Sequence, residues 1–187
     1  MIEKSFLIVV VGHLDGYLNA CFFLVTDIYE KLPSLSIHHA HGPKAIEEVR
    51  DLLQKYAELR SHDVALGDYE RELRQLPGAY AAPTGFLLLA RWDDSPVGCV
   101  AIRDLGEGFC EMKRMFVLPE HQGKGIGSTL ASEIIYAAKG AGYQHIRLDT
   151  HPWMAAAIKM YQALGFIEIG RYNENPTPGI RFFEKKL

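Results

Sequence analysis

A glycine-rich stretch at residues 117–128 holds the residues whose types and spacing most clearly indicate chemistry. Gly123, Gly125 and Gly127 lie directly before a segment with a helical pattern. Glycine lacks a Cβ atom, so successive backbone N–H groups can converge on one anion. A helix that begins at the same point adds the partial positive charge of its N-terminus. The sequence therefore predicts a phosphate-binding loop here.

Two common phosphate-binding loops do not fit these residues. A P-loop requires lysine followed by serine or threonine, whereas Lys124 is followed by Gly125. A Rossmann loop requires G-x-G-x-x-G at the first strand–helix turn, with an acidic residue about 20 positions later. Here the glycines are spaced by two and occur late in the chain. The residues favour a different phosphate-bearing ligand.

The stretch resembles the coenzyme A signature of the GCN5-related N-acetyltransferases (GNAT), Q/R-x-x-G-x-G/A. Gln122, Gly125 and Gly127 satisfy this signature, and Val117-Leu118-Pro119 resembles its usual lead-in. Residues 157–166 are similar to a second family segment, A-x-x-x-Y-x-x-x-G-F. The resemblance implies an α/β fold of the GNAT type and acetyl-CoA as co-substrate.

Hydrophobic periodicity predicts the elements that position this loop. The strands are expected at residues 35–40, 86–91, 97–103, 109–117, 145–150, 166–172 and 180–185, and the helices at 44–58, 68–76, 128–139 and 155–164. The second to fourth strands are expected to form an antiparallel meander. The order β-α-α-β-β-β-α-β-α-β-β is that of the GNAT fold, a mixed, mostly antiparallel sheet flanked by helices.

Length and composition limit the chain to one main domain. With 187 residues and 48% hydrophobic content, it would bury roughly 70% of the surface that its unfolded chain exposes. We predict the acetyltransferase domain at residues 35–187. Residues 1–34 are an extension of open role: a docking element, a dimer surface or an upstream start that is not always used. Its apolar runs are shorter than the ~20 residues of a membrane span, and it matches a signal peptide poorly.

Charge and cysteine content exclude several classes of protein. The formal charge of −3 is mixed along the chain, which disfavours nucleic-acid binding. The three cysteines are too scattered for disulfides or a zinc cluster. His38, His39 and His41 alternate without an acidic or cysteine ligand at a known spacing, so no metal is expected. We predict a cytoplasmic protein without a nucleic-acid or membrane partner, and the resemblance allows a homodimer.

The chemistry requires a base. An amine attacks a thioester only when it is neutral. An ordinary ammonium has a pKa of ~10.4, so its deprotonation at pH 7 costs about 4.6 kcal/mol. Glu111 is the candidate, because its register resembles that of the glutamate base in several acetyltransferases. Strand alternation predicts one face for Glu111, Lys113, Met115 and Val117. The alternative is a glutamate that only pairs with Lys113 or Arg103.

The leaving thiolate requires a proton donor. The thiol pKa is ~8.5, so protonation helps coenzyme A to depart. Tyr161 matches the tyrosine to which the resemblance assigns this role, and packing of the same ring is compatible with it. Met154 occupies a position where many members carry an asparagine.

The resemblance also assigns the acetyl-CoA contacts. Strand backbone would pair with the pantetheine arm, and the glycine loop would hold the pyrophosphate. The assigned residues are Met115, Phe116, Val117, Gln122, Gly123, Lys124, Gly125, Ile126, Gly127 and Ser128.

The acceptor is expected to be a primary amine of a small molecule or peptide, acetylated by direct attack in a ternary complex. Acidic residues of the helical region would suit a polyamine or aminoglycoside, whereas Arg171 or Arg181 would suit an amino-acid carboxylate. Cys110 is disfavoured as a nucleophile, because strand alternation places its side chain on the opposite face from Glu111. The alternative function is a noncatalytic coenzyme A-binding module, which would need the glycine loop but neither Glu111 nor Tyr161.

Overall fold

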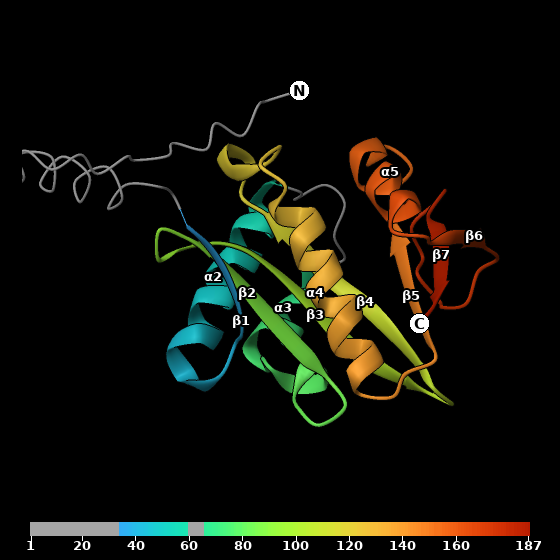
Figure 1. The fold of residues 1–187 in the computed structure, drawn as a ribbon, viewed down its shortest axis with the longest axis horizontal. Helices are drawn as coiled ribbons and strands as arrows, with labels where there is room; N and C mark the ends of the chain where they lie inside the picture. The colour runs from blue at the N-terminus through green and yellow to red at the C-terminus, as the bar shows by residue number, and fades with distance from the viewer. Residues whose placement is uncertain (1–33, 60–65) are drawn as a thin grey trace, which may run out of the picture. The chain divides into compact units, whose positions relative to one another are not determined.

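A seven-stranded sheet with the strand order β1-β2-β3-β4-β5-β7-β6 forms the centre of the protein (Figure 1). The structure is a computed structural model, and it describes residues 34–59 and 66–187. The strands are β1 (Leu35–His39), β2 (Phe86–Trp92), β3 (Ser95–Gly106), β4 (Phe109–Val117), β5 (His145–Thr150), β6 (Ile167–Ile169) and β7 (Arg181–Lys186). The helices are α2 (Gly42–Leu59), α3 (Leu66–Arg74), α4 (Ile126–Gly140) and α5 (Ala155–Ala163), with short 3₁₀ turns η1 (Gly78–Tyr80) and η2 (Pro119–His121).

This element order confirms the predicted fold, and β2 to β4 pair as the predicted antiparallel meander, with β1 antiparallel to β2. The strand predicted at residues 166–172 is wrong beyond Ile169. Pairing of β6 with β7 stops at Ile169 and Phe182, and the chain then turns so that Tyr172 reaches Glu111 of β4. The predicted extension lies outside the described residues except for Ser34, so its boundary stays a prediction.

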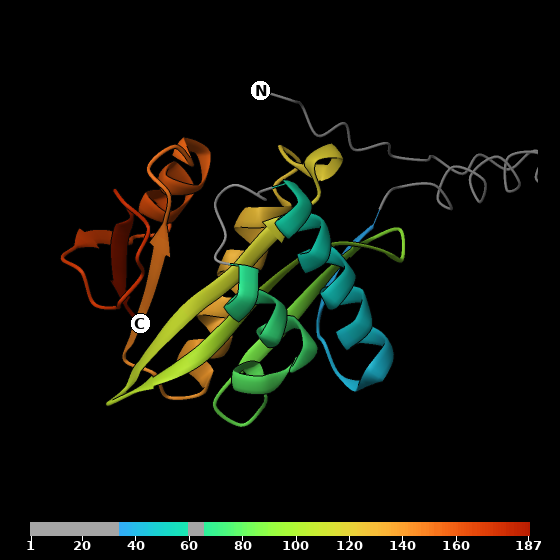
Figure 2. The ribbon, with the colours of Figure 1, turned by 180° about the vertical axis from the view of Figure 1, so that it is seen from behind.

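Helices cover both faces of the sheet (Figures 1 and 2): α4 lies on one face, and α2 and α3 lie on the other. Val49, Leu52 and Leu53 of α2 are buried, at the spacing that places them on one face of a helix. Leu130 and Ile134 of α4 are likewise buried, four residues apart on one face of that helix. Each fully buried leucine or isoleucine contributes roughly 1.5–3 kcal/mol. Within the described part of the chain, no helix has the length and apolar character needed to cross a membrane.

The sheet opens between β4 and β5. Their parallel pairing joins only Phe109, Cys110 and Glu111 to His145, Ile146 and Arg147. Beyond this point β4 continues to Val117, whereas β5 pairs with β7 on its other side. The two strands diverge in Figure 1. Among residues 34–59 and 66–187, the stretch of β4 after Glu111 therefore has no partner strand on the side of β5.

A bulge interrupts β4 at Arg114. This residue has a φ of +57°, and the register with β3 shifts between Cys99 and Ala101. Such a φ is costly for a residue with a Cβ atom, about 1 kcal/mol or more. The extra residue changes the alternation of side chains. Val117 consequently lies beside Gly127 of α4, so the prediction that it shares a face with Glu111 is wrong.

An ion pair connects this bulge to α3. The Arg114 Nε atom donates to Glu72 at 2.6 Å, and Nη2 contacts the second carboxylate oxygen. Tyr80 donates to the same carboxylate at 2.7 Å, and the guanidinium lies 4.6 Å from the centre of the Tyr69 ring. Burial alone would raise the pKa of Glu72, but the hydrogen bond and charge of Arg114, with a smaller effect of Tyr80, lower it overall.

We expect Glu72→Gln to reduce the free energy of unfolding by about 1–3 kcal/mol at pH 7, because Arg114 loses its charged partner. Since the folded-state pKa of Glu72 is lowered, its stabilisation is complete above the ordinary glutamate pKa of ~4.3 and is lost as the pH falls through the folded value. Denaturant unfolding of both proteins from pH 7 to pH 3 measures this difference. Glu70→Gln, which removes an exposed ion pair with Arg74, is the control; an equal effect of both variants would contradict the assignment.

Candidate functional site

Two cavities meet at the place where β4 and β5 diverge. The first, which we name the inner cavity, measures about 480 Å³ and lies between the sheet, α2, α3 and the loop after β6. The second, the loop cavity, measures about 770 Å³ and lies along the end of β4, residues 121–128 and the start of α5. Both are lined by Tyr56, Met115, Phe116 and Met154. The two cavities are therefore neighbours along one stretch of β4.

The glycine loop has the conformation that an anion site requires. Gly123 and Gly125 have φ values of +78° and +82°, and a Cβ atom at Gly123 would meet nothing within 4 Å. Within residues 34–59 and 66–187, the N–H groups of residues 123–125 donate no hydrogen bond. Gln122 Nε2 donates to the Val117 carbonyl at 2.9 Å, and Ser128 Oγ donates to the Gly125 carbonyl at 2.7 Å. These bonds fix the loop, and its N–H groups are available to a phosphate at the start of α4.

Eight of the ten residues predicted to contact acetyl-CoA line the loop cavity: Met115, Phe116, Val117, Gln122, Gly123, Gly125, Gly127 and Ser128. Ile126 does not line it, because its side chain is buried in the core. The Lys124 ammonium lies 5.1 Å from the centre of the Trp92 ring and 3.5 Å from His121 Nδ1. The loop can thus contribute the backbone of these two residues, but their side chains point elsewhere.

Glu111 is fully buried (0% exposed) beneath the inner cavity. Its Oε2 atom accepts from Arg103 Nε at 2.5 Å, and Oε1 accepts from the Tyr172 hydroxyl at 2.8 Å and from Asn173 Nδ2 at 3.0 Å. Lys113 Nζ lies 3.7 Å away. Both pairings of the alternative, with Arg103 and with Lys113, are therefore present. Both oxygens of this buried carboxyl group therefore have hydrogen-bond donors from the protein.

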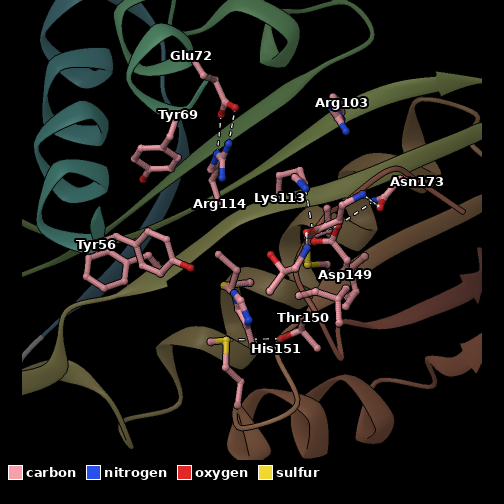
Figure 3. Close-up of a pocket in the computed structure, with 18 of the residues that line it drawn as sticks. Tyr56, Tyr69, Glu72, Arg103, Lys113, Arg114, Asp149, Thr150, His151 and Asn173 are labelled. Atoms are coloured by element: carbon pink, nitrogen blue, oxygen red, sulfur yellow. Dashed lines mark hydrogen bonds and ion pairs between the residues drawn. The ribbon is translucent and has the colours of Figure 1, made fainter. Parts of the chain in front are cut away.

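Asp149 extends this network into the cavity, as Figure 3 shows. Its carboxylate accepts from Lys113 at 3.4 Å, from Asn173 at 2.8 Å and from Asn175 at 3.2 Å. Burial alone would raise the pKa of Asp149, but the charge of Lys113 and the two amides lower it. The Asn173 amide nitrogen donates to Asp149 and to Glu111, so one side chain joins both carboxylates.

Sequence reasoning did not identify Tyr172, Asn173 and Asn175 as partners of these carboxylates. The two asparagines do have a sequence signal, because an asparagine side chain in a turn often accepts a hydrogen bond from the backbone N–H two residues later. Asn173 Oδ1 accepts from the Asn175 N–H, and Asn175 Oδ1 accepts from the Thr177 N–H, each at 3.0 Å. These turns fix the loop that closes the inner cavity. No pattern in the sequence marks Tyr172.

Tyr161 is buried and lines the inner cavity, beside Met115 and Met154. Its ring packs edge-on against Phe166 at 5.8 Å between centroids. Burial raises the pKa of Tyr161, and the nearby Tyr56 and Asp149 raise it further. The hydroxyl consequently keeps its proton across the working pH range. The ring has the packing contact that the sequence allowed, and its role as proton donor stays a prediction.

Cys110 is fully buried, and its Sγ atom lies 3.6 Å from the His145 carbonyl oxygen. Burial raises the pKa of the Cys110 thiol to about 12. A thiol that stays protonated is a poor nucleophile, which agrees with the predicted packing role. Among the described residues, no three histidine, cysteine or acidic side chains come together as metal ligands.

Comparisons with known proteins agree with this geometry. The acetyltransferase (GNAT) family profile matches residues 46–166. An uncharacterized N-acetyltransferase of Schizosaccharomyces pombe is 31% identical over 159 residues, which cover 84% of this chain and 98% of the relative. An acetyltransferase structure from Streptococcus agalactiae superposes with a TM-score of 0.70 at 19% identity, over 82% of this chain and 98% of that one. The structure of the PaiA N-acetyltransferase of Thermoplasma acidophilum in complex with coenzyme A superposes with a TM-score of 0.63 at 19% identity. The match covers 82% of this chain and 99% of that one. The chain therefore belongs to the acetyltransferase (GNAT) family and is an N-acetyltransferase, as the glycine loop and the order of its elements predicted.

Proposed function

We propose that the protein transfers the acetyl group of acetyl-CoA to a primary amine of a small molecule or peptide, by direct attack while both substrates are bound. The supporting observation is the meeting of two cavities at Met115 and Phe116. One cavity carries the anion-binding loop, and the other lies over buried acid–base groups. Two substrates that enter from these sides would bring their reacting atoms together along β4, which lowers the entropic cost of the reaction.

The loop cavity suits the coenzyme. The free N–H groups of residues 123–125 and the first turn of α4 would bind the pyrophosphate. The stretch of β4 from Met115 to Val117, which has no strand partner on the side of β5, would pair with the amides of the pantetheine arm. Acetyl-CoA supplies an activated acetyl group as a thioester.

Glu111 is the proposed base, and its burial defines how it acts. Because the carboxylate has no exposed surface, a water molecule in the inner cavity would carry the proton from the acceptor ammonium to it. The neutral amine then attacks the thioester carbon, and the carbon–sulfur bond breaks. Tyr161 donates its proton to the departing sulfur. The attacking nitrogen loses a proton as the amide forms, and that proton restores the Tyr161 hydroxyl, whose raised pKa favours the protonated form.

We expect Glu111→Gln to lower kcat at pH 7 by at least about 100-fold while the Kd of acetyl-CoA changes little. The loss should diminish towards pH 10, because the acceptor amine then becomes neutral without a base. Steady-state kinetics from pH 7 to pH 10, with calorimetry for Kd, measures both effects.

Two further variants make this test specific. Glu168→Gln removes an exposed ion pair with Arg181 and should leave kcat unchanged. Asp149→Asn keeps the hydrogen-bonding shape beside Asn173. A large, pH-dependent loss in Asp149→Asn together with near-normal Glu111→Gln would transfer the role of base to Asp149.

Tyr161→Phe keeps the ring packed against Phe166 and removes only the hydroxyl. We expect kcat to fall by about 10- to 100-fold with little change in acetyl-CoA affinity, because the thiolate would leave unprotonated. Single-turnover measurement of thiol release gives the chemical step directly. An unchanged rate would leave Tyr161 with its packing role alone.

Gly125→Ala tests the anion site. Gly125 has a φ of +82°, a conformation that costs alanine about 1–2 kcal/mol. The variant should relax the loop and raise the Kd of coenzyme A by about tenfold or more. Gly140→Ala, at the end of α4 with open space around it, is the control and should bind normally. Equal affinity of both variants and the wild type would refute the loop as the phosphate site.

A further inference from the structure

We infer that Arg103 selects acceptor amines that also carry a carboxylate, which it binds through its two terminal guanidinium nitrogens. This inference rests on the proposed function and defines the acceptor class of the same site. Arg103 lies on β3 opposite Glu111 and lines the inner cavity. Figure 3 shows its side chain at the edge of that cavity, near Lys113.

The hydrogen bonds of Arg103 leave half of its guanidinium available. Only Nε is used, in the bond to Glu111. Among residues 34–59 and 66–187, neither Nη1 nor Nη2 has a hydrogen-bond partner, and the side chain is 40% exposed. Two parallel N–H groups on a planar guanidinium match the two oxygens of a carboxylate. Glu111 holds the other side of the group, so the free nitrogens are fixed before a ligand arrives.

The other cations of the inner cavity are committed to protein carboxylates. Arg114 uses two nitrogens on Glu72. Lys113 lies between Glu111 and Asp149, at 3.7 Å and 3.4 Å, and is mostly buried. Arg103 is thus the cation best able to accept an anion from the cavity. The exposed carboxylate of Glu174 lines the same cavity and would attract the acceptor ammonium, which favours a molecule with both charges.

The two arginines that the sequence suggested for an acceptor carboxylate, Arg171 and Arg181, lie outside the inner cavity. Arg181 forms two hydrogen bonds with Glu168, at 2.7 Å and 2.6 Å. Arg171 is exposed, with its guanidinium 5.8 Å from the centre of the Phe182 ring. Neither residue lines the inner cavity. Arg171 therefore serves as a matched control for Arg103.

Paired acceptors test the inference. Each pair consists of one amine with a free carboxylate and its primary amide: glycylglycine and glycylglycinamide, 4-aminobutyrate and 4-aminobutanamide, lysine and lysinamide. Thiol release at saturating acetyl-CoA, with mass spectrometry of the product, gives kcat/KM for each compound. For at least one pair, the wild type should prefer the acid by about tenfold or more, the gain from one charge-assisted contact.

The acid-to-amide ratio of kcat/KM separates recognition from catalysis. Arg103→Gln also removes a partner of Glu111, but a weaker base slows both members of a pair alike, so the ratio still reports carboxylate binding. Arg103→Lys retains a charge beside Glu111 while it removes the planar fork, and it serves if the glutamine variant does not fold. Both variants should reduce the ratio to about twofold or less, whereas Arg171→Gln should keep the wild-type ratio.

The outcomes distinguish the inference from the function beneath it. The role of Arg103 would be overturned if the wild type acetylated amides as readily as acids. It would also be overturned if the preference for acids persisted in both Arg103 variants. Either result would leave the proposed amine acetyltransferase intact. Binding of acetyl-CoA without acetylation of any compound in the panel would overturn the proposed amine transfer, and the inference with it.

Discussion

The parting of β4 and β5 after Glu111 and Arg147 is the constraint on which the site depends. A parallel pair that continued to the end of both strands would fill the space that the two cavities occupy. Because β5 pairs with β7 from His145 to Thr150 on its other side, it keeps its conformation where it leaves β4. The sheet can therefore open without leaving β5 as an isolated strand, and in the described part of the chain the backbone of β4 beyond Glu111 is not paired with β5.

Glu111 lies fully buried at the closed end of this opening, and hydrogen bonds from the protein replace those of water. Removing a carboxylate from water costs several kcal/mol unless good partners replace the solvent. Arg103 of β3 supplies one hydrogen bond, and the neighbouring residues Tyr172 and Asn173 of the loop after β6 supply two more. The same partners also connect the loop after β6 to the middle of the sheet. Loss of one of them would leave a buried polar group with one hydrogen bond fewer.

The sequence was informative wherever local pattern decides structure. Helical and strand periodicity located every strand of the sheet, and the glycines of residues 123–127 predicted a loop whose positive φ values are found at Gly123 and Gly125. Both signals depend on neighbouring residues. The bulge at Arg114 was missed, since a positive φ at an arginine has no sequence signature and shifts the faces of the residues after it. The bond between Tyr172 and Glu111 spans 61 residues. Such contacts depend on how the chain folds back, which local patterns do not encode.

The double contact of Asn173 limits how this enzyme can diversify. The loop that closes the inner cavity would be the natural place for changes that admit new acceptors, since loops tolerate substitution better than strands. Yet Asn173 donates to both Glu111 and Asp149, so a change there alters the environment of both carboxylates as well as the shape of the cavity. The shape of the cavity and the hydrogen bonds of the two carboxylates are therefore coupled through Asn173. Paralogues with new substrates should vary Glu174 and Thr177 before they vary Asn173.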